Sequence, residues 1–322
     1  MPTEFELIRS LQKIFGVPRA PLVGIGDDAA VFRAPAGWDL VWTVDTHVEG
    51  VHFRWEWLKF EELGGRAAAC ALSDIAAMGA RPMHGLVSFE FPRDHPARNI
   101  LGIARGIRRE FQRCGASILG GNISSAAKFS VQITVIGRVQ RGKAWLRSTA
   151  RPGDDVYVTG SPGLSALALE ILSREKGRKA RFRPVLSRWR SPTARVREAL
   201  RLNGLVSAAI DVSDGLLADA RHMADASRVD LHLDLSAIPV PVKTRRALKE
   251  LGLDWTSLLA RPSDDYELLF TAKPRNRASI EQRLRGGVHR IGSVRRGIGR
   301  IWSCTPGATK VLLHPTGWDH LS

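Results

Sequence analysis

The sequence predicts an α/β (α+β) protein with two domains, and three observations support this. Short apolar runs typical of strands alternate with longer stretches of helical spacing in both halves of the chain. The 322 residues are long for one domain and ample for two. A turn sequence at 151–154, Arg-Pro-Gly-Asp, separates the two halves. We therefore expect one domain over residues 1–148 and a second over residues 149–322.

The first half contains two predicted strands and three predicted helices. The spacing of apolar residues predicts strands over 40–45 and 130–139, and helices over 1–16, 61–79 and 99–115. The helix over 61–79 should end at Gly79, because Gly79 and the nearby Pro82 are typical of helix ends.

The second half continues the alternation, with strands and helices of ordinary length. The predicted strands cover 155–160, 207–212, 230–235 and 267–272, with short strands near 288–294 and 299–303. The predicted helices cover 164–172, 215–227 and 243–251. Such a pattern is typical of a mixed α/β domain with its own sheet.

Composition narrows the class of protein. Hydrophobic residues make up 44% and charged residues 25%, as in soluble globular proteins, and no apolar run approaches the roughly 18 residues of a membrane span. The N-terminus lacks the apolar core of a secretory signal. The three cysteines are far apart and form no Cys-x-x-Cys pair, which fits a reducing cytoplasm. We expect a cytoplasmic protein with no membrane partner.

The net charge of +16 raises the question of a nucleic-acid partner. The basic residues are spread along the chain, and their densest run, 174–201, also fits a solvated helix face and loop. No RNA-recognition, zinc-finger or KH pattern is present. We therefore do not expect nucleic acid to be the partner.

The stretch Gly-Ile-Gly-Asp-Asp at 24–28 combines features that conflict at first sight. Its glycines suit the close approach of a phosphate, whereas the adjacent Asp27 and Asp28 would repel one. The third glycine of a dinucleotide fingerprint is missing, and no P-loop or protein-kinase motif occurs in the chain. A turn with an aspartate as hydrogen-bonding cap is the structural alternative.

Two more acids stand in positions that suit function. Asp45 ends the predicted strand over 40–45, with His52 in the loop that follows, although a single histidine is more often structural. Asp74 is the only charged residue over 67–80 of a predicted helix. A helix with so few charges packs on most sides, and a buried carboxylate needs a partner or a cation.

The second half repeats this arrangement. Asp211 and Ser213 share a face if their segment is a strand, and Asp214 with Gly215 then opens a helix. These residues could cap the helix, or hold a metal beside an anion at the helix N-terminus. Asp264, Asp265 and Glu267 precede or begin another predicted strand, where a solvated turn is the alternative.

Together, these acids resolve the conflict at 24–28. Mg²⁺ takes oxygen ligands and bridges carboxylates to phosphates. The aspartates can therefore hold Mg²⁺, which contacts a polyphosphate, while the glycines let that polyphosphate come close.

Eight motifs, in order along nearly the whole chain, carry a resemblance. They are GIGDDAAV (24–31), TVDTHVEGVHF (43–53), ALSDIAAMGARP (71–82), GGN (120–122), LRSTARPGDDVYVTG (146–160), AIDVSDGLLAD (209–219), DDYELLFT (264–271) and GWDHL (317–321). At these residues the chain resembles the thiamine-monophosphate kinase family, part of the aminoimidazole-ribonucleotide-synthetase-like ATP-binding superfamily.

The resemblance implies an N-terminal domain that binds ATP and Mg²⁺ and pairs in a homodimer, followed by a mixed α/β domain. It implies direct transfer of the γ-phosphoryl group of ATP to thiamine monophosphate. The implied metal ligands, of which the aspartates are also the catalytic residues, are Asp28, Thr43, Asp45, Asp74, Asn122, Asp211 and Asp214. The implied ATP contacts are Gly121, Asn122, Arg147 and Ser213. The implied thiamine-phosphate contacts are His52, Asp264 and Trp318.

The chain departs from the family pattern in two places. Asn122 stands where the family has an aspartate after two glycines, so an amide replaces one expected metal carboxylate. Pro262 and Ser263 stand where the family has two glycines, which bears on the placing of Asp264.

Two alternatives stay open from the sequence. One is another enzyme of the superfamily, such as an aminoimidazole ribonucleotide synthetase or a selenophosphate synthetase. The other is a non-enzymatic basic protein that binds nucleotides or nucleic acid, whose acids are structural.

Overall fold

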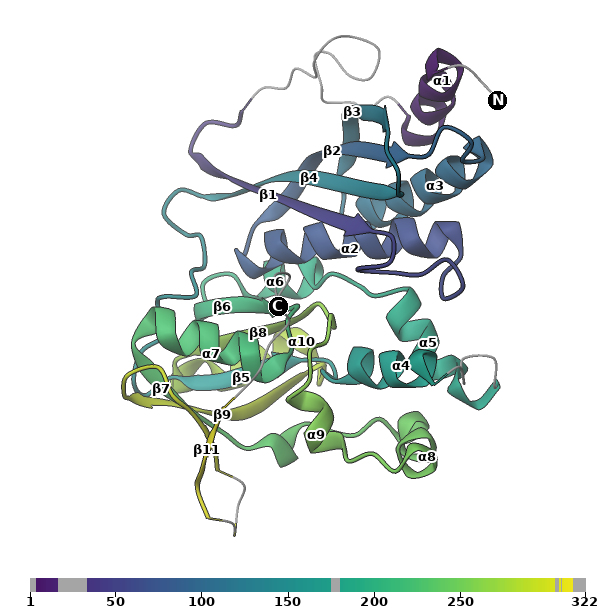
Figure 1. The fold of residues 1–322 in the computed structure, drawn as a ribbon. Coiled ribbons are helices and arrows are strands. Elements are labelled where there is room, and N and C mark those ends of the chain that lie inside the picture. The colour runs from purple at the N-terminus through teal and green to yellow at the C-terminus, as the bar shows by residue number, and fades with distance from the viewer. Residues whose placement is uncertain (1–3, 17–33, 175–179, 305–306, 308, 315–322) are drawn as a thin grey trace. The chain divides into compact units, whose positions relative to one another are not determined.

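The fold is shown in Figure 1 as a computed structural model, which describes residues 4–16, 34–174, 180–304, 307 and 309–314. The chain forms two compact units, which are described separately. The first contains residues 1–75, 80–144 and 190–196, and the second contains 76–79, 145–189 and 197–322.

The first unit is built on a four-stranded mixed sheet. Its elements are α1 (Glu4–Phe15), β1 (Trp38–Val48), α2 (Phe60–Ala77), β2 (Arg81–Phe91), α3 (Ala97–Arg113), β3 (Ser117–Ser125) and β4 (Ser130–Gln140). The strand order is β1-β4-β2-β3, antiparallel except for the parallel pair β2 and β3. Helix α3 is the connection that the parallel pair requires.

Helices α2 and α3 lie along one face of this sheet (Figure 1). Alternate residues of β1 point away from them, and these include Leu40, Trp42 and Val44, with Trp42 64% exposed. Leu86 of β2 is also exposed. Strand β4 pairs with both β1 and β2, and its Thr134 stands opposite Val44 of β1 and Leu86 of β2. These exposed side chains therefore lie on the same face of the sheet and form an apolar patch.

Two glycines allow α2 and α3 to pack very closely. A Cβ placed on Gly64 would lie 1.9 Å from the carbonyl oxygen of Ile103, and one on Gly106 would lie 2.1 Å from that of Glu61. Real Cβ atoms do not approach backbone oxygen so closely, so both positions require glycine. The backbone contact fixes α2 against α3 and thereby against the sheet.

The second unit contains a seven-stranded sheet in the order β11-β10-β7-β9-β5-β8-β6. Its strands are β5 (Asp155–Thr159), β6 (Val206–Val212), β7 (Val229–Leu233), β8 (Glu267–Ala272), β9 (Val288–Arg296), β10 (Ile301–Ser303) and β11 (Val311–Leu313). Neighbours are antiparallel except for β7 with β10. Its helices are α4 (Leu164–Ser173), α5 (Arg183–Arg190), α6 (Val196–Leu202), α7 (Leu216–Ser227), α8 (Val242–Leu251), α9 (Trp255–Leu259) and α10 (Arg277–Leu284). Arg190 and Val196 themselves belong to the first unit, and the last two residues of α2, Ala76 and Ala77, belong to the second.

The predicted two-part α/β (α+β) class is confirmed, and each predicted strand and helix is present, with shifted ends. The sequence patterns missed β2 and β3, along with helices α5, α6, α9 and α10 and strand β11. Strand β2 contains Pro82, next to an irregularity in its pairing with β4, and β3 contains Gly120 and Gly121. Proline and glycine are typical of strand breaks, so the residue pattern did not predict either strand.

Two local expectations were wrong. Asp45 does not end its strand, because β1 continues to Val48. The basic run at 174–201 is not only a solvated face, since Val185, Leu186 and Trp189 of α5 are buried. These apolar side chains attach the helix to the core, and Arg188 is half-buried and pairs with the buried Glu267.

We predict that Gly106→Ala destabilises the protein, although alanine is the better helix former by about 1 kcal/mol. The added methyl would strike the Glu61 carbonyl oxygen. Overpacking of this kind costs about 1–3 kcal/mol. Denaturant unfolding measures the effect, and Arg98→Ala on the exposed side of α3 is the control, expected within about 0.5 kcal/mol of the parent. A more stable Gly106→Ala protein would contradict the packing described.

Candidate functional site

In the first unit, polar side chains of α2 face polar side chains of β1. Arg66, Cys70 and Asp74 follow one another at intervals of four and so share one face of the helix. Thr43, Asp45 and His47 alternate along β1 and share the sheet face that the helix covers. Three of the sequence-predicted metal ligands, Thr43, Asp45 and Asp74, are therefore brought together.

The polar side chains of α2 and of β1 contact one another directly. The Thr43 hydroxyl donates a short hydrogen bond to the Asp74 carboxylate. Burial, followed by the charge of Asp74, raises the pKa of Asp45 to about 7, while a hydrogen bond from Cys70 opposes the shift. Two carboxylates this close repel one another whenever both are ionised.

This arrangement fits a divalent cation. The Oδ2 atom of Asp45 is buried and has no hydrogen-bond partner among the described residues. A buried carboxylate oxygen without a partner is costly, and a cation would satisfy it while neutralising the charge of Asp74 beside it. Oxygen donors from two carboxylates and a hydroxyl are the set that Mg²⁺ prefers.

Two histidines, His47 and His52, lie at the end of β1 and in the turn that follows it. Burial, the charge of Arg66 and the charge of His52 lower the pKa of His47 to about 3, so the buried ring is neutral. The ring of His52 lies 5.5 Å from that of His47, and its Nδ1 accepts a hydrogen bond from the backbone N–H of Val48. His52 therefore shapes the turn after β1, which is the structural alternative considered for it.

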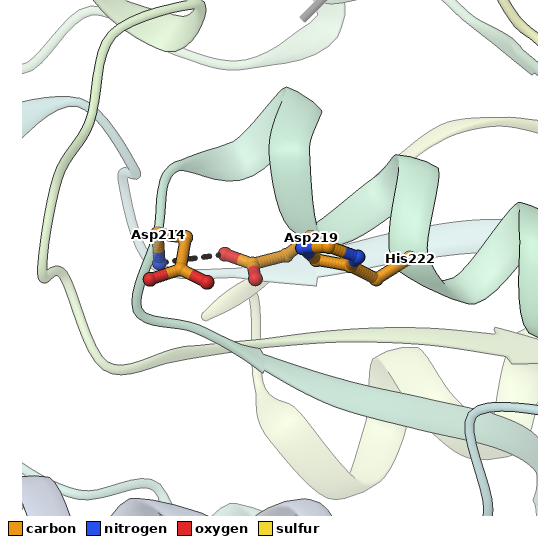
Figure 2. Close-up of side chains that lie close together, drawn as sticks. All are labelled: Asp214, Asp219 and His222. Atoms are coloured by element: carbon orange, nitrogen blue, oxygen red, sulfur yellow. Dashed lines mark hydrogen bonds between the residues drawn. The ribbon is translucent and has the colours of Figure 1, made fainter. Parts of the chain in front are cut away.

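In the second unit, the loop between β6 and α7 is held by Asp219. The Oδ2 atom of Asp219 accepts hydrogen bonds from the backbone N–H groups of Ser213 at 3.0 Å and Asp214 at 3.1 Å. Figure 2 shows the carboxylate of Asp219 pointing to the backbone nitrogen of Asp214. Burial, then the charges of Asp211 and Asp214, raise the pKa of Asp219 well above its usual value.

The cap expected at α7 has a different form. Gly215, not a serine or aspartate, occupies the N-cap position and makes no side-chain cap bond. Its φ of 114° and a Cβ position 2.4 Å from the Arg261 carbonyl oxygen both require glycine. Asp219, in the first turn of the helix, binds the N–H groups of Ser213 and Asp214 in the preceding loop and so fixes that loop.

A second set of ligand atoms lies at this loop. One atom each of Asp214, Asp219 and His222 lie within 4.8 Å of one another (Figure 2). The sequence patterns pointed to Asp211 and Asp214 but missed Asp219 and His222. The criterion applied to Asp74 does not find Asp219, because Arg221, His222 and Asp225 follow it closely in the same helix.

The acids near β8 are mainly structural. Asp265 is buried and accepts hydrogen bonds from the N–H groups of Gly163 and Ser165, at the start of α4. Glu267 accepts from Thr159 and Arg188. Asp264 is half-buried, and its backbone carbonyl accepts from the Ser165 hydroxyl. The alternative of a solvated turn was wrong for Asp265 and Glu267.

The remaining predicted residues are less closely grouped. Across the sheet, Gly121 stands opposite Val87, Val87 opposite Ile133, and Ile133 opposite Asp45, so Gly121 and Asp45 belong to one row of aligned residues. Asn122 stands opposite Ser88 and so belongs to the adjacent row. The Arg147 side chain is exposed. Asp28 and Trp318 lie outside the described residues.

The comparisons with known proteins agree across the whole chain. Residues 26–139 match the family model of the AIR synthase related protein N-terminal domain, and residues 151–297 match that of its C-terminal domain. Thiamine-monophosphate kinase of Bacillus subtilis is 32% identical over 98% of this chain and 99% of its own length. This chain belongs to the thiamine-monophosphate kinase family.

Solved structures place the fold in the same family. Thiamine-monophosphate kinase from Stenotrophomonas maltophilia superposes with a TM-score of 0.85 at 32% identity, covering 95% of this chain and 98% of that one. AaThiL complexed with AMPPCP and TMP gives a TM-score of 0.79 at 27% identity, covering 99% of both chains. Within the described part of this thiamine-monophosphate kinase family member, no helix has the length and apolar character to cross a membrane.

We predict that Asp45→Asn separates stability from metal binding. In EDTA at pH 8 the variant should be at least as stable as the parent, because it lacks one of two mutually repelling charges. Added Mg²⁺ should raise the melting temperature of the parent and raise that of the variant much less. The exposed Asp94→Asn is the control and should respond like the parent. An equal Mg²⁺ response in the Asp45 variant would remove this residue from the metal site.

Proposed function

We infer that this chain transfers the γ-phosphoryl group of ATP to the phosphate of thiamine monophosphate, forming thiamine diphosphate. The observation that carries this is a match over nearly the full chain to thiamine-monophosphate kinases, supported by a relative solved with AMPPCP and TMP. The acidic motifs support the activity, because each unit holds a group of carboxylates that could bind Mg²⁺, and Mg²⁺ neutralises phosphate charge in such a transfer.

We propose that Mg²⁺ is the metal. In the first unit its ligands would be Thr43, Asp45 and Asp74, and in the second unit Asp211 and Asp214 would hold Mg²⁺. Asp28 joins them from the glycine-rich motif. That Asn122 is a metal ligand stays a prediction from the resemblance. Its position opposite Ser88, and not in the row of Asp45, argues against that role.

The work of the chain in this reaction is positioning and charge neutralisation. Bound Mg²⁺ would supply positive charge to the phosphate oxygens. Gly121 and Ser213 would lie against the nucleotide, and Arg147 would offset its negative charge. No side-chain base is required, because a phosphate-monoester oxygen is already an anion at neutral pH.

We propose that the acceptor contacts His52, Asp264 and Trp318. His52 suits this from the turn after β1, which its ring already supports through Val48. Asp264 precedes β8 beside the start of α4. The assignment of Trp318 rests on the C-terminal GWDHL motif alone.

We propose that the protein acts as a homodimer formed through the first domain, residues 1–148. The exposed face of its sheet supports this, because Leu40, Trp42, Val44 and Leu86 present large apolar side chains to solvent. A second copy pairing on this face would remove that apolar surface from water.

A solved structure of another kind of protein shares the fold with this chain at lower identity. HypE, a hydrogenase maturation protein solved with ATP, superposes with a TM-score of 0.80 at 21% identity. The full-length matches at 32% are thiamine-monophosphate kinases. We therefore place thiamine monophosphate before the substrates of the wider superfamily.

We predict that thiamine diphosphate forms when ATP, Mg²⁺ and thiamine monophosphate are all present, and not when any one is omitted. Chromatographic separation of the thiamine phosphates measures this directly. Free thiamine is the matched control acceptor, because it lacks the anionic phosphate oxygen that attacks. Equal turnover of free thiamine would overturn the proposed acceptor.

We predict that Asp214→Asn lowers kcat/KM at least about a hundredfold, since it removes a carboxylate from a site that must hold cationic charge beside phosphates. Asp225→Asn, on the exposed side of α7, is the control and should stay within about threefold, because surface ion pairs contribute little. Activity near that of the parent in Asp214→Asn would withdraw Asp214 from the site.

A further inference from the structure

A separate cavity lies within the second unit. It has a volume of about 400 Å³, and its lining includes Asp155, His232, Arg277, Arg290 and Arg295. Its lining includes no residue of the β6–α7 loop described above. The cavity therefore is not part of the proposed kinase site, and the proposed function leaves it without a role.

Two arginines of the cavity are held in place by one buried carboxylate. Arg277 donates from Nε and Nη2 to Asp155 at 2.6 and 2.8 Å, and Nη1 of Arg290 lies 3.4 Å from the same carboxylate. The Asp155 side chain is 4% exposed, whereas those of Arg277 and Arg290 are 48% and 52% exposed. The guanidinium groups are thus anchored from inside and remain open to solvent.

The charge of Asp155 is already balanced by this pairing. Burial alone would raise its pKa, but hydrogen bonding and the charge of Arg277, followed by Arg290, lower it overall. Asp155 is therefore ionised at neutral pH and offsets one arginine of the pair. The second arginine of the pair and Arg295 outnumber the one further carboxylate of the lining, Asp234, so positive charge predominates in the cavity.

The surroundings of His232 also indicate positive charge. Its Nε2 lies 3.0 Å from Nζ of Lys310. Burial, then the charges of Lys310 and Arg295, lower the pKa of His232. A neutral imidazole can accept a hydrogen bond from the ammonium group, so Lys310 is a further basic side chain beside the cavity.

We propose that this cavity binds the phosphate group of a small anionic molecule. Arginine is suited to phosphate because its planar donors form paired, charge-assisted hydrogen bonds, and here two arginines are preorganised by Asp155. A volume of about 400 Å³ falls within the range of small-molecule sites. Asp234, also in the lining, is engaged by the N–H and hydroxyl groups of Ser236.

The test is calorimetric titration of the full chain with pyrophosphate in the presence of EDTA. Without divalent cations the carboxylates of the kinase site repel pyrophosphate, so binding there is suppressed. We expect one equivalent to bind the parent. Arg290→Gln and Arg295→Gln should each weaken binding about tenfold, the loss of one charge-assisted contact.

Arg296→Gln is the matched control, because Arg296 is the exposed neighbour of Arg295 on β9 and does not line the cavity. Its dissociation constant should stay within about twofold of the parent. The imidazole resonance of His232, assigned with His232→Gln, should shift on titration in the parent, and in Arg290→Gln the same shift should require about tenfold more pyrophosphate. Absence of binding, equal weakening by Arg296→Gln, or an unmoved His232 resonance would each overturn the proposal.

Discussion

The close contact between α2 and α3 is the constraint on which the first unit depends. Gly64 and Gly106 let the two backbones touch, and this fixes α2 at the depth where Asp74 reaches Thr43 and Asp45. The resulting pair of carboxylates is unfavourable in itself, since each raises the cost of ionising the other. Burial of the apolar residues of α2, such as Leu63, Leu72 and Ile75, offsets that cost.

The second unit uses acids in another way. Asp219 and Asp265 are buried, and each accepts hydrogen bonds from two backbone N–H groups near the start of a helix. Asp265 binds Gly163 and Ser165 at the start of α4 and so caps that helix from a distant part of the chain, whereas Asp219 binds Ser213 and Asp214 in the loop before α7. Because these acids are inside, they contribute nothing to the surface, which is correspondingly more basic than the overall composition suggests.

The sequence predicted the regular parts of the fold and the acids that meet in the first unit. Apolar periodicity located β1, β4, α2 and α3, and the isolation of Asp74 among apolar residues indicated its importance. It could not locate β2 and β3, because Pro82 and Gly121 are accommodated by the pairing of neighbouring strands, which is a property of the sheet and not of the segment.

The same limit applies to the candidate site. Asp28 and Trp318 were chosen from motifs, and their placement lies outside the described residues. Asp219 escaped notice because its partners, the N–H groups of Ser213 and Asp214, carry no side-chain signature. The cavity around Asp155 escaped for a related reason: Arg277 and Arg290 are far from Asp155 in sequence and meet it only through the tertiary fold.

The hydrogen bonds from Ser213 and Asp214 to Asp219 have a consequence for conformational entropy. Holding the backbone of one residue in a single conformation costs about 1–2 kcal/mol. In this loop, that ordering is completed when the chain folds, since Asp219 is 2% exposed and already bonded to both residues. An incoming ligand therefore meets a rigid surface, and its binding free energy is not reduced by having to freeze the loop.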